Sequence, residues 1–307
     1  MHITEIGAGE YKQLFKNMPH VFNSVEFTEL NKHKVEAINY LAFADGGKPK
    51  AGLIAGKRSG GLYSPFSAPF GGFTTNGKLR TGTMEEIVST LKQYSRSTGT
   101  PVHITLPPTV YNETQISKWA NTLQRYGTLL PINLNYHFDL AMFTRYQDII
   151  ERNARKNLRR AMQEDLELLY LGCTPDGIER AYEVIKANRE EHGYPLRMTL
   201  QDVKDTVETI KADFFVMTHG GTDVAAAQVF HVAEGTAQVI YWGDIKAYSH
   251  LRTMNRLAYS LFAHYHAQGL KTLDIGPSTE DGTPNNGLCD FKEGIGCRVT
   301  PKFSFIL

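Results

Sequence analysis

A run of basic side chains between residues 152 and 161, RNARKNLRRA, is suited to binding phosphate. Its cations are Arg152, Arg155, Lys156, Arg159 and Arg160. Apolar residues recur between them at helical spacing, which predicts a helix with one apolar face and a charged remainder. They are Ile150, Ala154, Leu158 and Ala161. Such cations give charge-assisted hydrogen bonds to a phosphate or a diphosphate-linked substrate. A merely solvated charged face is the alternative interpretation.

A second segment, residues 62–72, combines two prolines, three aromatic residues and a pair of glycines in the sequence LYSPFSAPFGG. This composition predicts a rigid, apolar loop. Such a loop either walls a ligand pocket, with Phe66 as the candidate contact, or fills the seam between two domains.

A third segment, residues 288–296, has the sequence LCDFKEGIG. Gly294 and Gly296 flank one apolar residue, which predicts a tight backbone turn. Lys292 precedes this turn, so its ammonium group could point into a cleft. The alternative is an ordinary surface ion pair of Lys292 with Glu293 or Asp290.

Several common catalytic motifs are absent from the sequence. There is no P-loop, no dinucleotide fingerprint, no H-E-x-x-H and no G-x-S-x-G. His264 and His266 are two positions apart on an expected helix and point to different faces, so they are poor co-ligands. No metal site is predicted.

Apolar periodicity and turn residues predict a mixture of helices and strands in both halves of the chain. In the first half we expect helices at 10–18, 84–98 and 116–126, and strands at 35–44, 51–56, 102–106 and around 136–139. In the second half we expect helices at 147–164, 175–192, 200–211 and 250–268, and strands at 166–171, 214–218, 224–233, 237–242, 271–276 and 303–305. Thr174 and Pro175 are a predicted helix start. Two domains, 1–144 and 145–307, fit the length of 307 residues. Because no flexible linker joins them, we expect a shared cleft.

Composition narrows the class of protein. Hydrophobic residues make up 41% of the chain and charged residues 21%, as in globular proteins, and the net charge is +1. No overall electric field draws the protein to nucleic acid or to a membrane surface, although a local charged patch could still do so. The start of the sequence has no signal-peptide pattern, and no apolar run reaches the length of a membrane span. The three cysteines, Cys173, Cys289 and Cys297, are sparse and odd in number, which suits a reducing compartment. We therefore expect a cytoplasmic protein.

The three segments together resemble the FemABX-like branch of the GNAT (acyl-CoA N-acyltransferase) superfamily. The matching pieces are R-x-x-R-K-N-L-R-R-A at 152–161, SPFSAPFGG at 64–72 and FKEGIG at 291–296. Tyr241-Trp242-Gly243, followed by the helix that includes residues 252–259, is similar to the last core strand and the next helix of that family. Each motif is weak alone, but their order along the chain is that of the family.

The resemblance implies an α/β (α+β) fold of two tandem GNAT-like domains, each a mixed, mainly antiparallel sheet flanked by helices. It implies an acyltransferase that moves an acyl or aminoacyl group onto an amine of a cell-envelope or polysaccharide precursor. The implied donor is acyl-CoA or aminoacyl-tRNA, with no tightly bound cofactor. The implied partners are a phosphate-bearing or peptidoglycan-type acceptor and a charged tRNA.

The resemblance also implies roles for single residues. Lys292 matches a lysine thought to steady the reacting centre, and we predict that it is catalytic, acting on the developing oxyanion or on the leaving group. Tyr241 matches an aromatic residue near the acceptor. Arg189 and the neighbouring Tyr194 lie where the family binds the acceptor phosphates. From the basic helix, Arg155 and Arg159 are the predicted phosphate contacts.

The chain departs from the family pattern in two places. Asp165 stands where relatives usually have a glycine after the basic helix. No Q/R-x-x-G-x-G/A loop follows the expected strand 237–242, and in single-domain GNAT enzymes this loop binds the CoA pyrophosphate. Its absence argues against conventional CoA binding and is compatible with a tRNA-borne donor.

Three functions remain open at this level. The first is the transferase, for which Asp139, Asp244 and His231 are alternative general bases, although His231 also fits a packed core position. The second is a catalytically inactive module that binds a nucleotide-sugar or a peptide. The third is an RNA-binding protein that uses the basic helix, against which stand the near-neutral charge and the absence of an evident aromatic platform beside the arginines.

Overall fold

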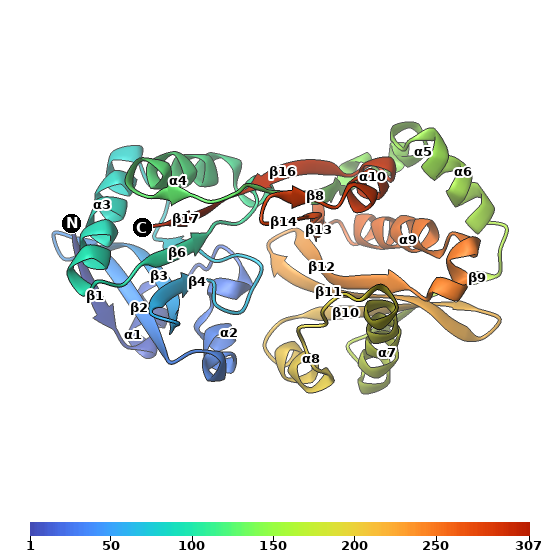
Figure 1. Ribbon diagram of the computed structural model, residues 1–307, viewed down its shortest axis with the longest axis horizontal. Helices are drawn as coiled ribbons and strands as arrows, with labels where there is room; N and C mark the ends of the chain where they lie inside the picture. Colours follow the sequence, from blue (N-terminus) through green and yellow to red (C-terminus); the bar gives the residue numbers. More distant parts are fainter. The chain divides into compact units, whose positions relative to one another are not determined.

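The protein is described by a computed structural model that covers all of its residues, Met1–Leu307. The chain forms two compact units (Figure 1). Unit 1 comprises Met1–Leu134, Thr279–Thr283 and Thr300–Leu307, and unit 2 comprises Asn135–Ser278 and Pro284–Val299. The sequence analysis divided the chain into two continuous domains, with one boundary between residues 144 and 145. The units of the structure are discontinuous because the end of the chain returns to the sheet of unit 1.

Unit 1 is built on one mixed sheet. Its strands are β1 (His2–Ile6), β2 (Ala37–Asp45), β3 (Lys48–Arg58), β4 (Gly61–Ser64), β5 (Phe73–Thr75), β6 (Val102–Thr105), β7 (Thr128–Leu129) and β17 (Ser304–Ile306). Its helices are α1 (Ala8–Leu14), α2 (Val25–Leu30), α3 (Thr81–Thr98) and α4 (Glu113–Tyr126), with short 3-10 turns at Val21–Asn23, Lys32–Lys34 and Thr109–Tyr111. The strand order is β1-β2-β3-β4-β6-β17-β7, and β5 also pairs with β3.

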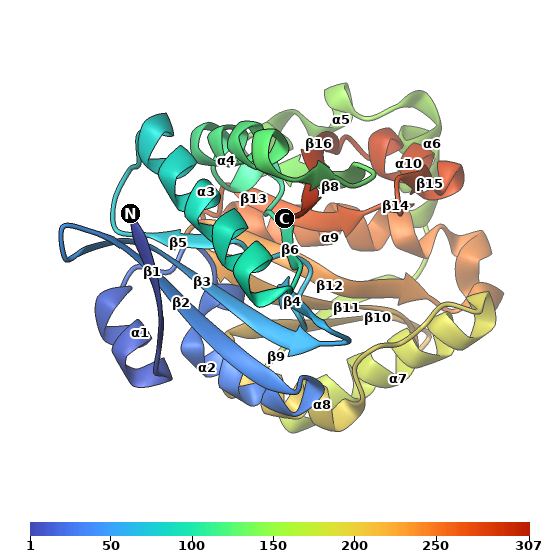
Figure 2. The same cartoon turned by 60° about the vertical axis from the view of Figure 1, so that its left-hand side comes forward.

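Helices cover both faces of this sheet (Figure 2). Leu41 and Phe43 of β2 belong to the core that α3 and α4 complete. The intervening residues Tyr40 and Ala42 pack with Tyr11 of α1 in a second core. This alternation follows from the two-residue period of a strand, and β2 is apolar on both sides because both sides are covered.

Unit 2 is built on a second mixed sheet. Its strands are β8 (Asn133–Asp139), β9 (Leu166–Gly172), β10 (Ala212–His219), β11 (Thr222–Ala233), β12 (Thr236–Asp244), β13 (Thr272–Pro277) and β16 (Arg298–Lys302). Its helices are α5 (Tyr146–Ile149), α6 (Arg152–Ala161), α7 (Pro175–His192), α8 (Leu200–Val207), α9 (Thr253–Ala267) and α10 (Asn286–Gly294), with 3-10 segments η4 (Leu140–Arg145) and η5 (Lys246–Leu251). A two-stranded ribbon, β14 (Thr279–Glu280) with β15 (Thr283–Pro284), precedes α10 and, apart from Pro284, belongs to unit 1.

The strand order of the second sheet is β16-β8-β13-β12-β11-β10-β9. Neighbouring strands from β9 to β12 are antiparallel, and β12 with β13 is parallel. Helices α7 and α8 lie on one side of this sheet, and α9 and α10 on the other (Figure 1). The predicted class, α/β with two mixed, mainly antiparallel sheets flanked by helices, is confirmed.

Local structure departs from the sequence predictions at two functional segments. The expected helix 147–164 is interrupted, because Ile150 and Glu151 are extended and separate α5 from α6. The expected turn at Gly294–Gly296 exists, but it ends a helix, α10, whose start is capped by Asn285. The predicted start of α7 is confirmed, with the Thr174 side chain accepting a hydrogen bond from the Gly177 backbone. No helix combines the length and the apolar character needed to cross a membrane.

Candidate functional site

The central strands of unit 2 separate from one another at one end. The parallel pairing of β12 with β13 joins Thr236–Gln238 to Thr272–Asp274, and no ladder pair follows. The register of β12 against β11 shifts here, since Gln228 is opposite Tyr241 and Val229 is opposite Val239. This bulge turns β12 away from β13. The backbone of β12 beyond Gln238 therefore has no ladder partner on its β13 side.

Lys292 secures the separated end of β13. Its side chain is only 2% exposed, although it lies on α10. The ammonium group donates to the carbonyl oxygens of Ile275, Gly276 and Pro277, at 2.8, 2.9 and 3.1 Å. An ammonium group has three N–H donors, so these three bonds use all of them. The alternative expectation, a surface ion pair with Glu293 or Asp290, is wrong because Lys292 is buried and bonded to backbone carbonyls.

The surroundings of Lys292 act on its pKa in opposite directions, because burial disfavours the ammonium form and the nearby Asp274 favours it. Burial lowers the pKa of Lys292 to about 8, and the cation Arg189 acts in the same direction. The Lys292 nitrogen also lies 5.4 Å from the centre of the Tyr136 ring. Gly276, whose carbonyl Lys292 binds, has a φ of +72°. This left-handed conformation is one that glycine adopts without strain.

A buried carboxylate holds the same strand from within the sheet. Asp274 is fully buried and accepts hydrogen bonds from the Asn135 and Gln238 side chains at 2.8 and 2.9 Å. It also accepts from the Gly276 backbone at 2.8 Å. The sequence analysis missed this network. The signal that could have revealed this network is the position of Asp274 in an otherwise apolar strand. A carboxylate that is buried in such a strand needs hydrogen-bond partners.

Arg189 of α7 carries a positive charge without a carboxylate partner. It forms no ion pair, and its Nε is buried without a hydrogen-bond partner. Its guanidinium carbon lies 5.2 Å from the Tyr241 ring centre and 5.8 Å from that of Tyr194. Burial lowers the pKa of Arg189 and raises the pKa of Tyr241. The Tyr241 hydroxyl accepts a hydrogen bond from the Arg197 backbone at 3.3 Å. The structure thus brings Arg189, Tyr194 and Tyr241 together, and the roles predicted for them stay predictions.

Close packing fixes β12 against α7 beside this group. The amide of Asn188 donates to the Asp244 carbonyl at 2.7 Å. A Cβ placed on Gly243 would lie 2.3 Å from the Asn188 Oδ1, so only glycine fits there. On α10, Phe291 contacts Trp242 with 6.2 Å between ring centres. The sequence analysis did not identify Asn188.

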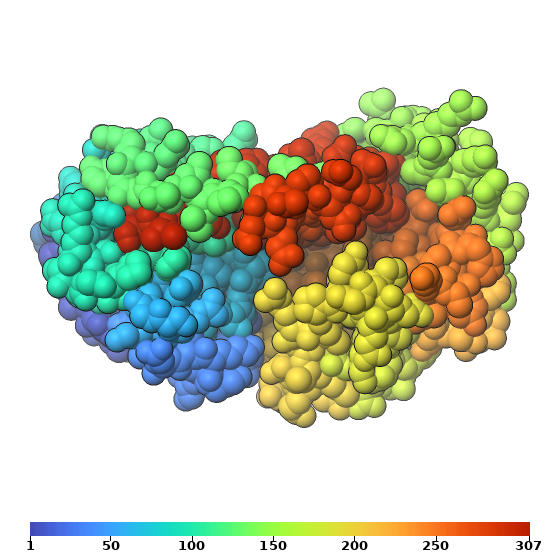
Figure 3. All heavy atoms as spheres, in the orientation of Figure 1, coloured from blue at the N-terminus to red at the C-terminus, as the bar shows by residue number.

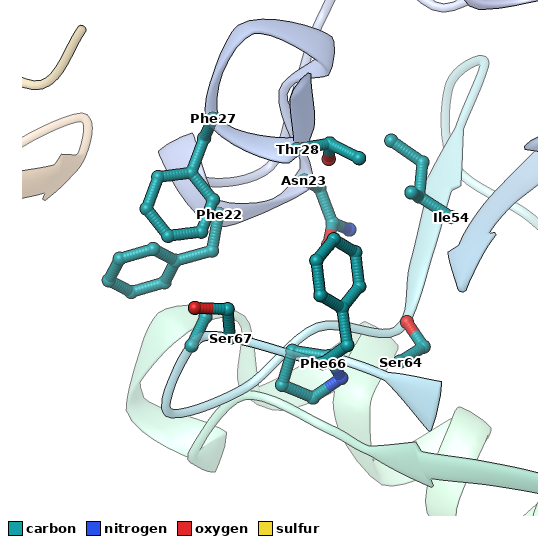
Figure 4. A pocket seen from close by; sticks show the side chains of 10 residues that line it. Phe22, Asn23, Phe27, Thr28, Ile54, Ser64, Phe66 and Ser67 are labelled. Carbon is teal, nitrogen blue, oxygen red and sulfur yellow. The ribbon is translucent and has the colours of Figure 1, made fainter. Parts of the chain in front are cut away.

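The remaining predicted site residues lie elsewhere. Arg155 is half-buried on α6 and donates to the Ile150 carbonyl at 3.1 Å, whereas Arg159 is exposed on the same helix. Phe66 belongs to unit 1 and points into a pocket toward Asn23 (Figure 4). The space left in this pocket is about 10 Å³, enough for no more than one water molecule. The roles predicted for these residues stay predictions.

The start of α9 does not suit a pyrophosphate group. The Asp244 carboxylate accepts hydrogen bonds from Ser249, at 3.2 Å, and from Thr253, the first residue of α9. A helix N-terminus attracts anions, and here the attraction is satisfied by the protein's own carboxylate. A second anion at this point would meet negative charge. The residues present therefore do not fit the pyrophosphate of CoA bound at this helix.

The three candidate bases are all engaged in hydrogen bonds. Asp139 caps η4 by accepting from the Ala141 backbone and pairs with Arg298 at 3.3 Å. His231 binds the buried Asp213 at 2.6 Å, as expected of a packed core histidine. Asp244 is bonded at the start of α9. No cluster of His, Cys, Asp or Glu side chains is arranged to hold a metal ion, and all three cysteines are free thiols.

Comparison with known proteins agrees with this geometry. Residues 152–293 match the family described as acetyltransferase (GNAT) domain. No curated protein sequence matches the chain.

Solved structures are similar over the whole chain. FemX has a TM-score of 0.67 and 12% identity, covering 100% of this chain and 98% of the other. L-PGS from Bacillus licheniformis has a TM-score of 0.62 and 14% identity, covering 98% and 93%. A tandem GNAT protein from the clavulanic acid biosynthesis pathway has a TM-score of 0.54 and 10% identity, covering 100% and 98%. At these identities the likeness is one of fold. Residues 152–293 thus match a GNAT acetyltransferase domain, and the fold of the whole chain is similar to those of FemX and the tandem GNAT protein.

Proposed function

We propose that the protein is an N-acyltransferase or aminoacyltransferase that acts on an amine of an anionic cell-envelope or polysaccharide precursor. One observation carries the proposal. Strand β12, which separates from β13 beyond Gln238, also carries Tyr241. The ring of Tyr241 lies against Arg189, a half-buried cation without a carboxylate partner. Strand β12 thus places an unpaired stretch of backbone close to a cation that could bind an anion.

The reaction requires an unprotonated amine, two reactants held together and a stabilised oxyanion. The amine nitrogen forms a bond to the acyl carbon and loses a proton. The acyl carbon loses its bond to the oxygen or sulfur of the donor, which leaves with the electron pair. Unpaired backbone N–H groups on β12 are fixed donors of the kind that stabilise the oxyanion of such a reaction.

Lys292 acts in this proposal by positioning β13. Its three donors are already used by backbone carbonyls, so a direct bond to an oxyanion would require one of those carbonyls to be released. Holding the carbonyls of residues 275–277 keeps β13 apart from β12 and keeps the β12 backbone open. We therefore propose that the reaction depends on Lys292 as a positioning residue, because it holds the end of β13.

The donor that we favour is an aminoacyl ester carried on tRNA rather than acyl-CoA. The support is Asp244, whose carboxylate occupies the helix start that would receive a pyrophosphate. For the acceptor we favour a phosphate-bearing precursor such as a nucleotide-linked sugar or muropeptide. Arg189 is the proposed phosphate contact, and Tyr194 and Tyr241 are its aromatic walls.

A second candidate function is an inactive module that binds a nucleotide-sugar or a peptide. The bonding of Lys292 favours it, because all three donors of its ammonium group are bonded to backbone carbonyls. This candidate keeps Arg189 as an anion contact and removes the chemical step.

A thermal-shift screen followed by a transfer assay tests the proposal. The ligands are acyl-CoAs, charged tRNA and UDP-linked sugars or muropeptides. A ligand at 100 times its Kd adds about 2.7 kcal/mol to the unfolding free energy. We expect stabilisation by an anionic acceptor, loss of that stabilisation in Arg189→Met, and transfer of a labelled aminoacyl group to the acceptor. Lys186→Met, an exposed cation on the same helix, is the matched control.

The outcomes separate the two candidates. Acceptor binding without transfer from any donor supports the inactive module. Binding that is unchanged in Arg189→Met, or stabilisation by no anionic ligand, contradicts both.

A further inference from the structure

The exposed face of α6 is a row of unpaired cations. Arg152, Lys156, Arg159 and Arg160 are exposed, and none of them forms an ion pair. Their spacing places them along one side of the helix over roughly 12 Å of its length. We call these four residues the α6 row. In a chain of net charge +1, this row is a local concentration of positive charge.

The opposite face of α6 is not available to a lipid surface. Ala154, Leu158 and Ala161 are 8%, 2% and 0% exposed, in a helix that packs on α9 and α10. A helix that lies in a membrane interface needs an exposed apolar face as well as cations. The surface that α6 exposes is therefore charged and has no apolar stripe beside it.

An aromatic depression of about 460 Å³ lies in the same unit, between η4, α5 and α9. It is lined by Phe143, Thr144, Arg145, Tyr146, Gln147, Asp148, Tyr259 and His266. The ring of Phe143 lies 5.4 Å from those of Tyr259 and His266. The only carboxylate in the lining, Asp148, is paired with Arg145. None of these lining residues belongs to α6, beside whose arginines the sequence suggested no aromatic platform.

Arg256 connects the depression with the α6 row. Its guanidinium contacts Met162, which directly follows α6, and lies 5.9 Å from the Tyr259 ring centre. The atoms of residues 145–165 lie at the surface beside those of α9 (Figure 3). The α6 row, Arg256 and the aromatic depression follow one another along the surface. Single-stranded nucleic acids are bound by this combination, in which cations contact the phosphates and aromatic rings stack on the bases.

We propose that the α6 row and this depression bind a single-stranded polynucleotide, with phosphates on the row and a base against Phe143 and Tyr259. Unpaired cations supply the attraction to the phosphodiester backbone, and the rings supply a surface for stacking. A lone phosphate would use the row and leave the aromatic depression empty. This site does not depend on the proposed acyl transfer.

Fluorescence anisotropy of a labelled RNA of about 12 nucleotides tests the charge component. Single-strand binding loses affinity with a log–log salt slope of about −0.7 per neutralised phosphate, or about −3 for four contacts. We expect R152Q/K156Q/R159Q/R160Q to lower affinity at least tenfold and to remove most of this slope. The matched control, K16Q/K48Q/K78Q/K211Q, changes the net charge equally at exposed positions that form no ion pair. Equal losses in the two variants would overturn the proposal.

A second pair of measurements tests the stacking component. Tyr259→Leu should weaken binding by roughly tenfold without changing the salt slope, since base stacking is not an ionic interaction. Replacement of the bases by abasic sites should remove the difference between Tyr259→Leu and the unaltered protein. Duplex RNA that binds as tightly as the single strand, or Tyr259→Leu that binds normally, would contradict the assignment. Circular dichroism of each variant establishes that it is folded.

Discussion

The ammonium nitrogen of Lys292 lies 2.9 Å from the carbonyl oxygen of Gly276. The two residues come from different elements, α10 and β13, and this bond fastens a helix to the loose end of a parallel strand. The bonds from Lys292 satisfy carbonyl oxygens at the end of β13, where its ladder with β12 has ended. Lys292 thus holds the end of β13 beyond its ladder with β12, while Asp274 holds the strand to Gln238 of β12.

Replacing Lys292 by methionine removes these bonds and leaves three buried carbonyl groups without their donor. We expect the unfolding free energy to fall by roughly 2 kcal/mol, because the cost of unsatisfied groups exceeds the gain from removing a buried charge. Chemical denaturation measures this change. Lys292→Arg, which keeps donors but is larger, should restore part of the stability. Equal stability of Lys292→Met and the unaltered protein would show that the bonds contribute nothing.

The lowered pKa of Lys292 predicts a pH-dependent stability. Below pH 8 the side chain is protonated in both the folded and the unfolded state. Between about 8 and its ordinary value of 10.5, the unfolded state binds the proton and the folded state does not. The unfolding free energy therefore rises with pH in this window, by about 3 kcal/mol over the full range.

The measurement is the difference in unfolding free energy between the protein and Lys292→Met at several pH values. Titration of tyrosines is common to both proteins and cancels. A difference that stays constant from pH 7 to pH 10.5 would mean that the ammonium group titrates normally.

The contact of Asn188 with Gly243 predicts a coupled pair of substitutions. Gly243→Ala places a methyl group against the buried Asn188 amide and should cost roughly 1–3 kcal/mol. Asn188→Ala loses a hydrogen bond to Asp244 and should cost about 1 kcal/mol. The double variant should be more stable than the sum of the two losses predicts, since the shortened side chain makes room for the methyl group. Strictly additive losses would argue against this contact.

The isolation of Arg189 predicts an affinity that depends on salt. A phosphate-bearing ligand such as a UDP-linked sugar should bind less tightly as salt rises, because salt ions screen the attraction between the guanidinium and the phosphate. Arg189→Met should weaken binding by about tenfold to a hundredfold and reduce the salt dependence, and Arg189→Lys should recover part of the affinity. Calorimetric titration at two salt concentrations measures both effects. Salt-independent binding by the unaltered protein would exclude Arg189 as a charge-dependent contact.

Periodic local patterns predicted much of the fold. The spacing of Ala154 and Leu158 identified the buried face of α6, and Thr174 with Pro175 identified the start of α7. Helix α10 was missed because its sequence is rich in turn formers. Its start depends on a single Asn285 cap and its stability on burial of Lys292.

The sequence predicted only those residues of the candidate site whose side chains match positions in the family pattern. Arg189, Tyr194 and Tyr241 were named from the family resemblance, and the structure groups them. The partners of Lys292 are backbone carbonyls at positions 275–277, and a pattern of side chains does not predict bonds to the backbone. The network around Asp274 joins three strands, so it depends on a sheet topology that pairwise spacing does not encode.

The last strand of the chain, β17, lies between β6 and β7 in the sheet of unit 1. Phe305 and Leu307 are 1% and 4% exposed in its core, and Ser95 donates to the Leu307 carbonyl at 2.9 Å. During synthesis, the N-terminal half emerges from the ribosome long before the residues that complete its own sheet. The sheet that begins near residue 2 must therefore wait for residues 304–307 before it can close, and loss of these residues would damage a part of the molecule that is made much earlier.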